Sequence, residues 1–365
     1  MQVPYLALRR HFDHDALARQ LRRHLSDTDF ILGESVTQFE QDFAALCHSE
    51  YAVGVNSGHD ALFLALKALD IGPGDEVITA PNSFIASAGA IVATGATPVF
   101  ADVGADYNLD PDAVAAAVTP RTRALLPVHL TGTPADMPAL AAIAERHGLA
   151  VVEDAAQAVG ASLQGRPVGA FGNAGCFSLH PLKNLPVAGD GGVVTTSRPE
   201  LAERLRRLRN HGLCNRNEIA HFGYNSRLDT LQATVARFGL ARLADITAAR
   251  RRHAAHYDRL LAGIDGVTLP PRRADAEPVF HTYVIQVEAR DALIGFLAER
   301  GVETKIHYPI PIHLQAPCRA MGHGPGDFPV CEAQSGRILS LPVNEHLTDA
   351  QIAYVADAVA RFYAA

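Results

Sequence analysis

Two side chains in the middle of the sequence have the chemistry of a Schiff-base enzyme. Lys183 stands in residues 177–184, a loop after a short apolar run, and Asp154 ends the largely apolar segment 150–154. A lysine amine can form a Schiff base with an aldehyde cofactor, and a carboxylate can hold the proton of a pyridinium ring. The pair therefore indicates chemistry that depends on pyridoxal phosphate.

Each of the two side chains also has an ordinary interpretation. A loop lysine is usually solvated, but Lys183 lies between His180-Pro181 and the glycine-rich residues 189–192 in an apolar neighbourhood, which lowers the pKa of an amine. Asp154 would serve equally well as the N-cap of a helix over residues 155–159. A buried carboxylate needs a cationic partner, and Lys183 is what favours the cofactor interpretation.

Other residues could bind the remaining parts of such a cofactor. Ser57 and Gly58 lie between an expected strand and an expected helix, where backbone N–H groups and a hydroxyl can hold a phosphate. This signal is weak alone, because a helix N-cap followed by a turn glycine looks the same. Ser178 offers a second hydroxyl. Phe84 could stack on a flat ring, although an aromatic after a strand is more often part of a core.

The elements that must position these residues alternate along the chain. Apolar segments typical of strands are separated by helical patterns, clearest over residues 60–69 and 137–147. This alternation predicts an α/β fold with a mostly parallel sheet covered on both faces. The expected strands are residues 51–55, 76–79, 97–103, 124–129, 150–153, 175–178 and 192–195.

The C-terminal third predicts a second, smaller domain. A long helical stretch from residue 228 to about residue 261 leads to a break at Pro270-Pro271 and a polar segment, residues 272–277. A strand over residues 281–287, a helix over 291–299 and a strand over 304–307 follow. We therefore expect a large domain over residues 1–245 and an α+β domain over residues 246–365, with about the first 25 residues free to pack on the smaller one.

Composition excludes several classes of protein. The 365 residues are 48% apolar and carry a formal charge of −7, without the dense basic block expected of a nucleic-acid or anionic-membrane surface. The N-terminus has no signal-peptide pattern and no apolar run reaches membrane-spanning length, so we expect a cytoplasmic protein. The scattered cysteines predict neither a disulfide framework nor a metal site; they are Cys47, Cys176, Cys214, Cys318 and Cys331.

Taken together, the motifs resemble those of the DegT/DnrJ/EryC1/StrS family of sugar aminotransferases from end to end. They occur in the family's order at residues 30–33 with Phe39 and Glu40, 57–58, 72–77, 132–136, 153–157, 177–184 and 223–232. The resemblance implies dependence on pyridoxal phosphate and the aspartate-aminotransferase type of fold, fold type I.

The resemblance also implies roles for individual residues. Lys183 would be the Schiff-base lysine, Asp154 the partner of the pyridine nitrogen, and Gln157 a contact on the side of the phenolic oxygen. Ser57, Gly58 and Ser178 match phosphate-binding positions, and Phe84 matches the stacking aromatic. Asn225 matches an asparagine that reaches the phosphate of the neighbouring subunit, which implies a homodimer with shared active sites. His59 departs from the family's usual threonine.

The implied substrates are L-glutamate and a nucleotide-linked keto-sugar. Residues 223–232, 306–313, 326–329 and 339–342 are similar to relatives that aminate C3 of dTDP-linked 3-keto-6-deoxyhexoses, whereas C4 relatives more often have Asn-Tyr-Arg-Met at the first of these segments. His307 and His313 would line the substrate pocket or simply stiffen a proline-rich turn. Arg227 and Lys305 would contact the diphosphate or be surface charges.

Three other functions are disfavoured. A sugar dehydratase of the same family would have histidine in place of Lys183. An NAD-dependent oxidoreductase needs a G-x-G-x-x-G turn, and the glycines at 165–175 and 189–192 lack that spacing. A regulatory protein would tolerate the loss of Lys183 or Asp154, and both are present. The remaining rival is an aminotransferase that acts on a C4-keto-sugar or a cyclitol.

Overall fold

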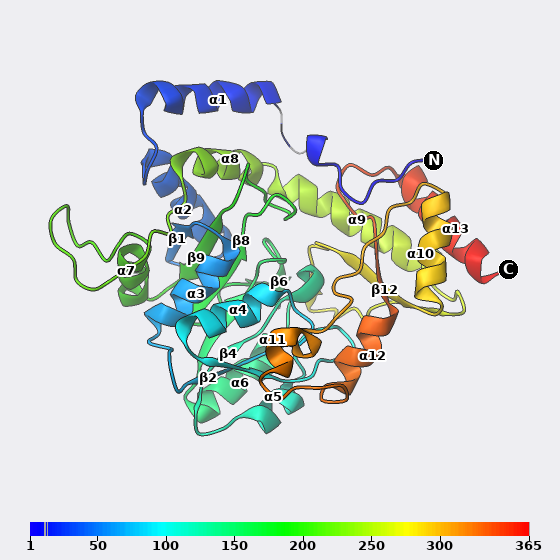
Figure 1. The fold of residues 1–365 in the computed structure, drawn as a ribbon. Coiled ribbons are helices and arrows are strands. Elements are labelled where there is room, and N and C mark those ends of the chain that lie inside the picture. The colour runs from blue at the N-terminus through cyan, green and yellow to red at the C-terminus, as the bar shows by residue number, and fades with distance from the viewer. Residues whose placement is uncertain (11, 13, 365) are drawn as a thin grey trace.

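A seven-stranded sheet forms the centre of the computed structural model, which describes residues 1–10, 12 and 14–364 (Figure 1). The strand order is β1-β9-β8-β5-β4-β2-β3. All neighbours pair in parallel except that β9 is antiparallel to both β1 and β8. The predicted α/β fold with a mostly parallel sheet is therefore confirmed. The strands are β1 (Tyr51–Val55), β2 (Glu76–Thr79), β3 (Thr97–Phe100), β4 (Thr122–Leu126), β5 (Ala150–Asp154), β8 (Ala174–Ser178) and β9 (Gly192–Thr196).

Helices cover both faces of this sheet, because successive side chains of a strand point to opposite faces. In β4, Ala124 and Leu126 join a core with α3, whereas Leu125 joins a core with α6 on the other face. Helices α3 (Gly58–Ala68), α4 (Ile85–Thr94) and α7 (Pro199–Leu208) contribute to the first face. The second face packs against α2 (Glu34–Leu46), α5 (Pro111–Ala117), α6 (Met137–His147) and α8 (Thr230–Leu240).

Two strands are shorter than predicted. β3 ends at Phe100 rather than at residue 103, and β4 ends at Leu126 rather than at residue 129. The apolar pattern continues past both strands because Val103 and Val128 are buried as well, although each pairs only in a single bridge, Val103 with Leu109 and Val128 with Asp154. Buried residues that pair at only one position thus give the same apolar pattern in the sequence as a longer strand.

A second, antiparallel sheet of three strands lies in the C-terminal part, in the order β10-β12-β13. It packs with the helix α9 (Leu243–Leu261) and with α10 (Arg290–Glu299) and α13 (Asp349–Tyr363) around a separate core. The strands are β10 (Val267–Thr268), β12 (Tyr283–Val287) and β13 (Ile338–Leu341). The remaining elements are β6 (Ser162–Leu163), β7 (Arg166–Pro167), β11 (Ala276–Glu277), η1 (Leu8–Arg10), η2 (Leu130–Gly132), η3 (Ile312–Leu314), α11 (Ala316–Arg319) and α12 (Pro329–Arg337).

Two predictions for the C-terminal part were wrong in detail. The helical stretch over 228–261 is two helices, since α8 ends before Ala241 and α9 begins after Arg242. Residues 304–307 do not form a strand: Lys305 alone pairs with Ser340 in a single bridge, and the actual third strand is β13. A segment that pairs at only one residue can thus have the same short sequence pattern as a strand.

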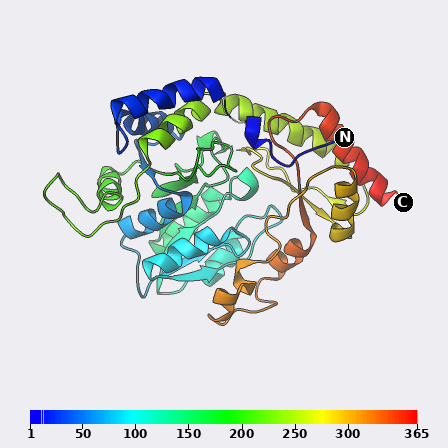
Figure 2. The ribbon, with the colours of Figure 1, turned by 45° about the horizontal axis from the view of Figure 1, so that its top comes forward.

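The N-terminal segment joins the two parts of the chain. Val3 pairs with Val302, and the Val3 N–H donates to the Gly301 carbonyl at 2.9 Å. Helix α1 (His14–Asp27) instead lies along α8, where His24 Nε2 is 2.7 Å from Thr234 Oγ1 (Figure 2). The division into residues 1–245 and 246–365 remains a proposal, since α9 runs across that boundary. Among the described residues, no helix is long and apolar enough to cross a membrane.

Candidate active site at the carboxyl edge of the large sheet

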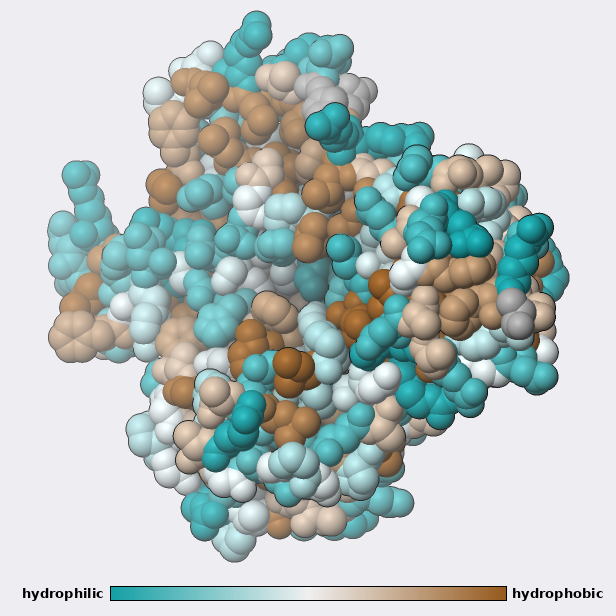
Figure 3. Space-filling view, turned by 45° about the vertical axis from the view of Figure 1, so that its right-hand side comes forward, coloured by the Kyte–Doolittle hydropathy of each residue, from teal (hydrophilic) through white to brown (hydrophobic). Residues whose placement is uncertain are grey.

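A cavity of about 420 Å³ lies between the carboxyl ends of the large-sheet strands and segments from the N- and C-terminal parts. On the surface, Figure 3 shows a hollow near the centre of the face with hydrophobic residues close to its rim. Among the residues singled out in the sequence, those that line the cavity are Ser57, Gly58, His59, Phe84, Asp154, Gln157, Ser178, Lys183, Lys305 and His307. The structure therefore collects in one place residues that are far apart in the chain.

Asp154 presents its carboxylate to this cavity from the end of β5. Oδ2 accepts a hydrogen bond from the Ser87 hydroxyl at 2.7 Å, and Oδ1 accepts one from the Ala156 N–H at 3.2 Å. Burial raises the pKa of Asp154, while these two hydrogen bonds and the nearby Lys183 amine oppose the rise. The alternative role as a helix N-cap does not apply, because residues 155–159 form turns rather than a helix.

Lys183 lies in the loop between β8 and β9, which is closed at its base. The Leu179 N–H donates to the Gly191 carbonyl at 2.8 Å, and the Val187 N–H donates to the Leu179 carbonyl at 2.8 Å. The Lys183 side chain is partly buried, and its amine has no hydrogen-bond or ion-pair partner among the described residues. Burial lowers its pKa to about 8, against the opposing effect of Asp154. A larger neutral fraction makes the amine a better nucleophile at neutral pH.

We expect this lowered pKa to be measurable in the cofactor-free protein. The rate at which an acylating reagent modifies Lys183 should rise with pH around a midpoint of about 8 instead of the ordinary 10.5, because only the neutral amine reacts. Peptide mapping by mass spectrometry gives the rate. Asp154→Asn is the matched control and should lower the midpoint further by removing a negative charge. A midpoint near 10.5 would contradict the predicted burial effect.

The N-terminus of α3 meets the end of β8 at a point suited to an anion. Ser57 caps the helix, its Oγ accepting from the Asp60 N–H at 3.0 Å, so the N-cap interpretation is correct. A Cβ atom at Gly58 would lie only 2.6 Å from Ser178 Cβ, and glycine thus permits the close approach. Free N–H groups of the first helical turn and the Ser178 hydroxyl face the same cavity, the arrangement that binds phosphate.

Gln157 and Phe84 contact the segment that closes the cavity from the C-terminal part. Gln157 Oε1 accepts from the Thr131 N–H at 2.8 Å, and its Nε2 lies 3.5 Å from the Tyr308 hydroxyl. The Phe84 ring is 5.7 Å from the Tyr308 ring and is 54% exposed. Phe84 is thus part of the cavity wall. Its position after a strand had suggested a core residue instead.

His307 is held in a neutral state on the same wall. Its Nδ1 lies 2.9 Å from the Ser340 hydroxyl, and its ring stacks on Tyr5 with the centroids 5.8 Å apart. Burial lowers its pKa to about 4, assisted by the positive charges of Lys183 and Lys305. A neutral imidazole can exchange hydrogen bonds with a sugar hydroxyl without bringing a charge to it.

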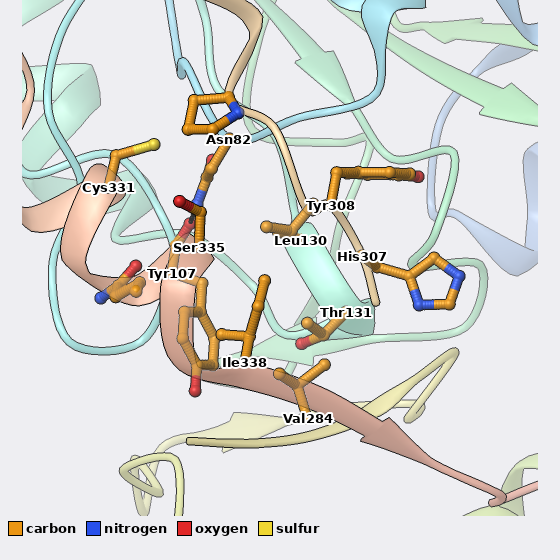
Figure 4. Close-up of a pocket in the computed structure, with 12 residues that line it drawn as sticks. Asn82, Tyr107, Leu130, Thr131, Val284, His307, Tyr308, Cys331, Ser335 and Ile338 are labelled. Atoms are coloured by element: carbon orange, nitrogen blue, oxygen red, sulfur yellow. Dashed lines mark hydrogen bonds between the residues drawn. The ribbon is translucent and has the colours of Figure 1, made fainter. Parts of the chain in front are cut away.

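His307 and Tyr308 stand at the junction of the two parts of the chain (Figure 4). Leu130 and Thr131 from the large-sheet side approach Val284 and Ile338 from the small sheet there, leaving a space of only about 10 Å³. This close packing fixes the backbone that carries the two side chains toward the larger cavity.

Three predicted residues do not reach this cavity. His313 is buried, with Nε2 3.0 Å from Glu332 Oε1 and its ring against Phe328, so the structure favours its role in stiffening the proline-rich turn over a role in substrate binding. Arg227 donates to Asn210 Oδ1 at 3.0 Å, outside the cavity. Asn225 is exposed at the base of the long loop between α7 and α8, where it pairs with Asn210 in a single bridge; the rest of that loop extends away from the sheet (Figure 1).

Sequence reasoning missed several lining residues. Tyr5, His281 and Tyr308 all face the cavity. His281 Nδ1 lies 3.3 Å from Asn184 Oδ1, and burial together with nearby cations keeps its pKa well below the ordinary value. None of the three has a spacing that marks it for chemistry. Only Asn184, next to Lys183, could have pointed to His281 as a neighbour.

The cavity thus combines an amine that has no partner among the described residues, a buried carboxylate near it, and a helix N-terminus that can bind phosphate. This arrangement fits pyridoxal phosphate at each of its polar groups. The cofactor's aldehyde, ring nitrogen and phosphate each have a matching group in the cavity. Together with the mostly parallel sheet, this site defines a pyridoxal phosphate-dependent enzyme of fold type I.

Comparison with known proteins specifies the class further. The chain belongs to the DegT/DnrJ/EryC1/StrS aminotransferase family, whose sequence pattern matches residues 13–360. It is 47% identical over 366 residues to the dTDP-3-amino-3,4,6-trideoxy-alpha-D-glucose transaminase of Streptomyces venezuelae, covering 98% of this chain and 95% of that protein. The predicted family is thereby confirmed.

Solved structures agree with this assignment. The crystal structure of DesV from S. venezuelae matches with a TM-score of 0.97 at 46% identity, over 99% of this chain and 98% of that one. NtdA from Bacillus subtilis with bound cofactor PMP matches with a TM-score of 0.91 at 30% identity, over 99% of this chain and 85% of that one. The protein is thus an aminotransferase that depends on pyridoxal phosphate.

Proposed function

We propose that this aminotransferase moves the amino group of L-glutamate to C3 of a dTDP-linked 3-keto-6-deoxyhexose. The observation that carries the proposal is the cavity in which Lys183 faces Asp154, in a chain similar throughout to a transaminase named for a dTDP-3-amino sugar. A C4-keto-sugar or a cyclitol is the alternative acceptor.

The proposed roles follow from the positions of the side chains. The bound cofactor supplies an electron sink. The Lys183 amine would attach the cofactor and, once displaced by the amino donor, would carry the proton from the donor's α-carbon to the carbon that had carried the cofactor's aldehyde. Asp154 holds the proton of the ring nitrogen, and Gln157 faces the phenolic side. Ser57, Gly58 and Ser178 bind the phosphate, and Phe84 stacks on the ring.

The acceptor would approach from the side of the small sheet. There, Lys305 is exposed at the cavity, where it could pair with a diphosphate, and the neutral His307 could bind the sugar. His313 has no place in this proposal because its ring is buried next to Glu332. Arg227 shares the exposed α7–α8 loop region with Asn225, so a direct role would require the cavity of another subunit.

The test begins with the absorption spectrum of the purified protein before and after L-glutamate is added. A visible band that moves to the pyridoxamine position supports the cofactor, the lysine and the donor together. The glutamate-treated protein is then mixed with dTDP-linked 3-keto and 4-keto sugars, and NMR of the product locates the new amino group. Nitrogen at C4, or turnover of a cyclitol alone, would overturn the proposed acceptor.

We also propose a homodimer in which Asn225 contacts the phosphate bound by its partner. The supporting observations are that Asn225 is exposed on a loop outside its own cavity and that this loop carries Phe222, which is 92% exposed. The same loop also exposes Ile219 and Tyr224, and a group of exposed apolar side chains favours a protein contact. A cytoplasmic location is part of the proposal, because the cysteines of the described residues are all free thiols.

Mixing two inactive variants tests the shared site. We expect Asn225→Ala to retain the cofactor weakly and therefore to lose its activity when free cofactor is removed. Under the same conditions, a dimer of one Lys183→Ala and one Asn225→Ala subunit should regain about half of the wild-type activity, because one of its sites then has both residues intact. Activity is measured after the subunits are exchanged and the mixed dimer is isolated by two affinity tags. A mixed dimer as inactive as its parents would show that Asn225 serves its own subunit.

A further inference from the structure

Two serines connect the wall of the cavity to the carboxylate of Asp154. Ser83 lines the cavity, and its Oγ lies 2.8 Å from Ser87 Oγ. Ser87 Oγ in turn donates to Asp154 Oδ2 at 2.7 Å. Ser87 lies in the first turn of α4, whereas Ser83 lies in the loop just before the N-cap Phe84, and the chain brings the two hydroxyls together there.

The positions of the hydroxyl protons in this chain follow from what each group can donate. An ionised carboxylate only accepts, so the single proton of the Ser87 hydroxyl points to Asp154. Ser87 Oγ must therefore accept from the Ser83 hydroxyl, which is its only other hydrogen-bond partner among the described residues. Both hydroxyls are thus aligned toward the negative charge, and such aligned donors stabilise it cooperatively.

The two serines and the carboxylate that they support are all buried. Ser87 is fully buried and Ser83 is 4% exposed, while Asp154 is 5% exposed. Water therefore has little access to the edge of the carboxylate that Ser87 contacts, and no other side chain is hydrogen-bonded to that carboxylate in the described part of the chain. Without the Ser87 hydroxyl, Oδ2 would lose its donor in a site where water cannot easily replace it.

We propose that Ser87, supported by Ser83, is a positioning residue that keeps Asp154 ionised and its carboxylate aimed at the cofactor's ring nitrogen. This inference rests on the assignment of Asp154 to that nitrogen. The ionised carboxylate leaves the proton on the ring, whereas a carboxylate stripped of its donor draws that proton toward itself. Ser87 thereby acts on the electronic state of the ring without touching it.

The test uses pyridoxamine phosphate, which binds without a covalent bond to Lys183 and so isolates the contact with Asp154. Ser87→Ala should raise its dissociation constant about tenfold, the effect of losing one buried hydrogen bond to a charged group. With ¹⁵N in the ring, the NMR signal of the bound nitrogen should move toward the unprotonated position. Ser87→Thr keeps a hydroxyl and should retain the wild-type signal.

Two further variants make the comparison specific. Ser83→Ala removes only the outer donor and should raise the dissociation constant about threefold, as expected for a neutral hydrogen bond. Thr94→Val is the matched control, because it removes a buried hydroxyl of the same helix that donates to the Ile91 carbonyl and accepts from the Ala96 N–H, away from Asp154. It should leave both the dissociation constant and the nitrogen signal unchanged.

Either of two outcomes would overturn the proposal: wild-type affinity and nitrogen signal in Ser87→Ala, or an equal loss in Thr94→Val. If Ser87→Ala does not fold, an unchanged nitrogen signal in Ser83→Ala would have the same force. No sugar acceptor is used, so failure to aminate a dTDP-keto-sugar would overturn the proposed acceptor alone. Wild-type protein that does not bind pyridoxamine phosphate would overturn both.

Discussion

Lys183→Ala is expected to lower kcat for transamination by about 10³-fold or more, because the variant loses both the attachment point of the cofactor and the base that moves the proton. The visible absorbance of the lysine-bound cofactor should disappear as well. The fold should survive, since the amine makes no hydrogen bond or ion pair among the described residues. The measurements are single-turnover kinetics with L-glutamate, the absorption spectrum, and thermal unfolding.

The scarcity of lysine makes this experiment easy to interpret. The sequence contains three lysines, Lys67, Lys183 and Lys305, so borohydride reduction of the loaded enzyme followed by peptide mapping identifies the attachment site directly. Lys67→Ala is the matched control and should keep full activity. A small primary amine added to Lys183→Ala should restore part of the proton transfer by entering the vacated space. Substantial transamination by Lys183→Ala without added amine would refute the assignment.

Asp154→Asn is expected to lower kcat/KM by about 10²- to 10³-fold, the range for removing one preorganised electrostatic partner from an active site. The amide has nearly the shape of the carboxylate but cannot hold the proton on the ring nitrogen, so the ring withdraws electrons less strongly. Affinity for pyridoxamine phosphate should fall at the same time. Steady-state kinetics with glutamate and equilibrium dialysis measure the two effects.

A chemically altered cofactor separates charge from shape in this variant. Pyridoxal phosphate methylated at the ring nitrogen carries a permanent positive charge and needs no proton from the protein. It should therefore support Asp154→Asn better than the ordinary cofactor does, whereas the wild-type enzyme should gain nothing. Equal activity of the variant with both cofactors would mean that the role of Asp154 is not to maintain the charge of the ring.

Most of the fold could be predicted because the buried strands of the sheet appear in the sequence as short apolar runs. The strands β1, β2 and β5 are buried on both sides and produce apolar runs that end close to where the strands end. Errors arose where pairing is limited to one position: Val103, Val128 and Lys305 each pair in a single bridge and not in a continuous strand. Local sequence cannot distinguish burial from pairing in such segments.

Some residues of the site could likewise be predicted from the sequence, and others could not. Lys183, Asp154 and Ser178 stand at or just after the ends of neighbouring strands, so the topology of a parallel sheet brings them together and their motifs predict it. Ser87 and Tyr308 reach the site only through the packing of α4 and the docking of the C-terminal part. His313 was assigned to the pocket because residues 306–313 are similar to those of relatives that aminate C3, but η3 turns it into the interior.

Strand β9 runs against its neighbours, and the chain therefore enters and leaves the lysine loop at the same edge of the sheet. The main-chain hydrogen bonds of Leu179 close the loop, so the position of the Lys183 amine does not depend on any crossover helix. His307 and Tyr308, in contrast, come from a part of the chain with its own core. The surface that selects the acceptor and the loop that carries the reactive amine therefore belong to different parts of the fold. Substitutions in the first can change the acceptor during evolution without altering the second.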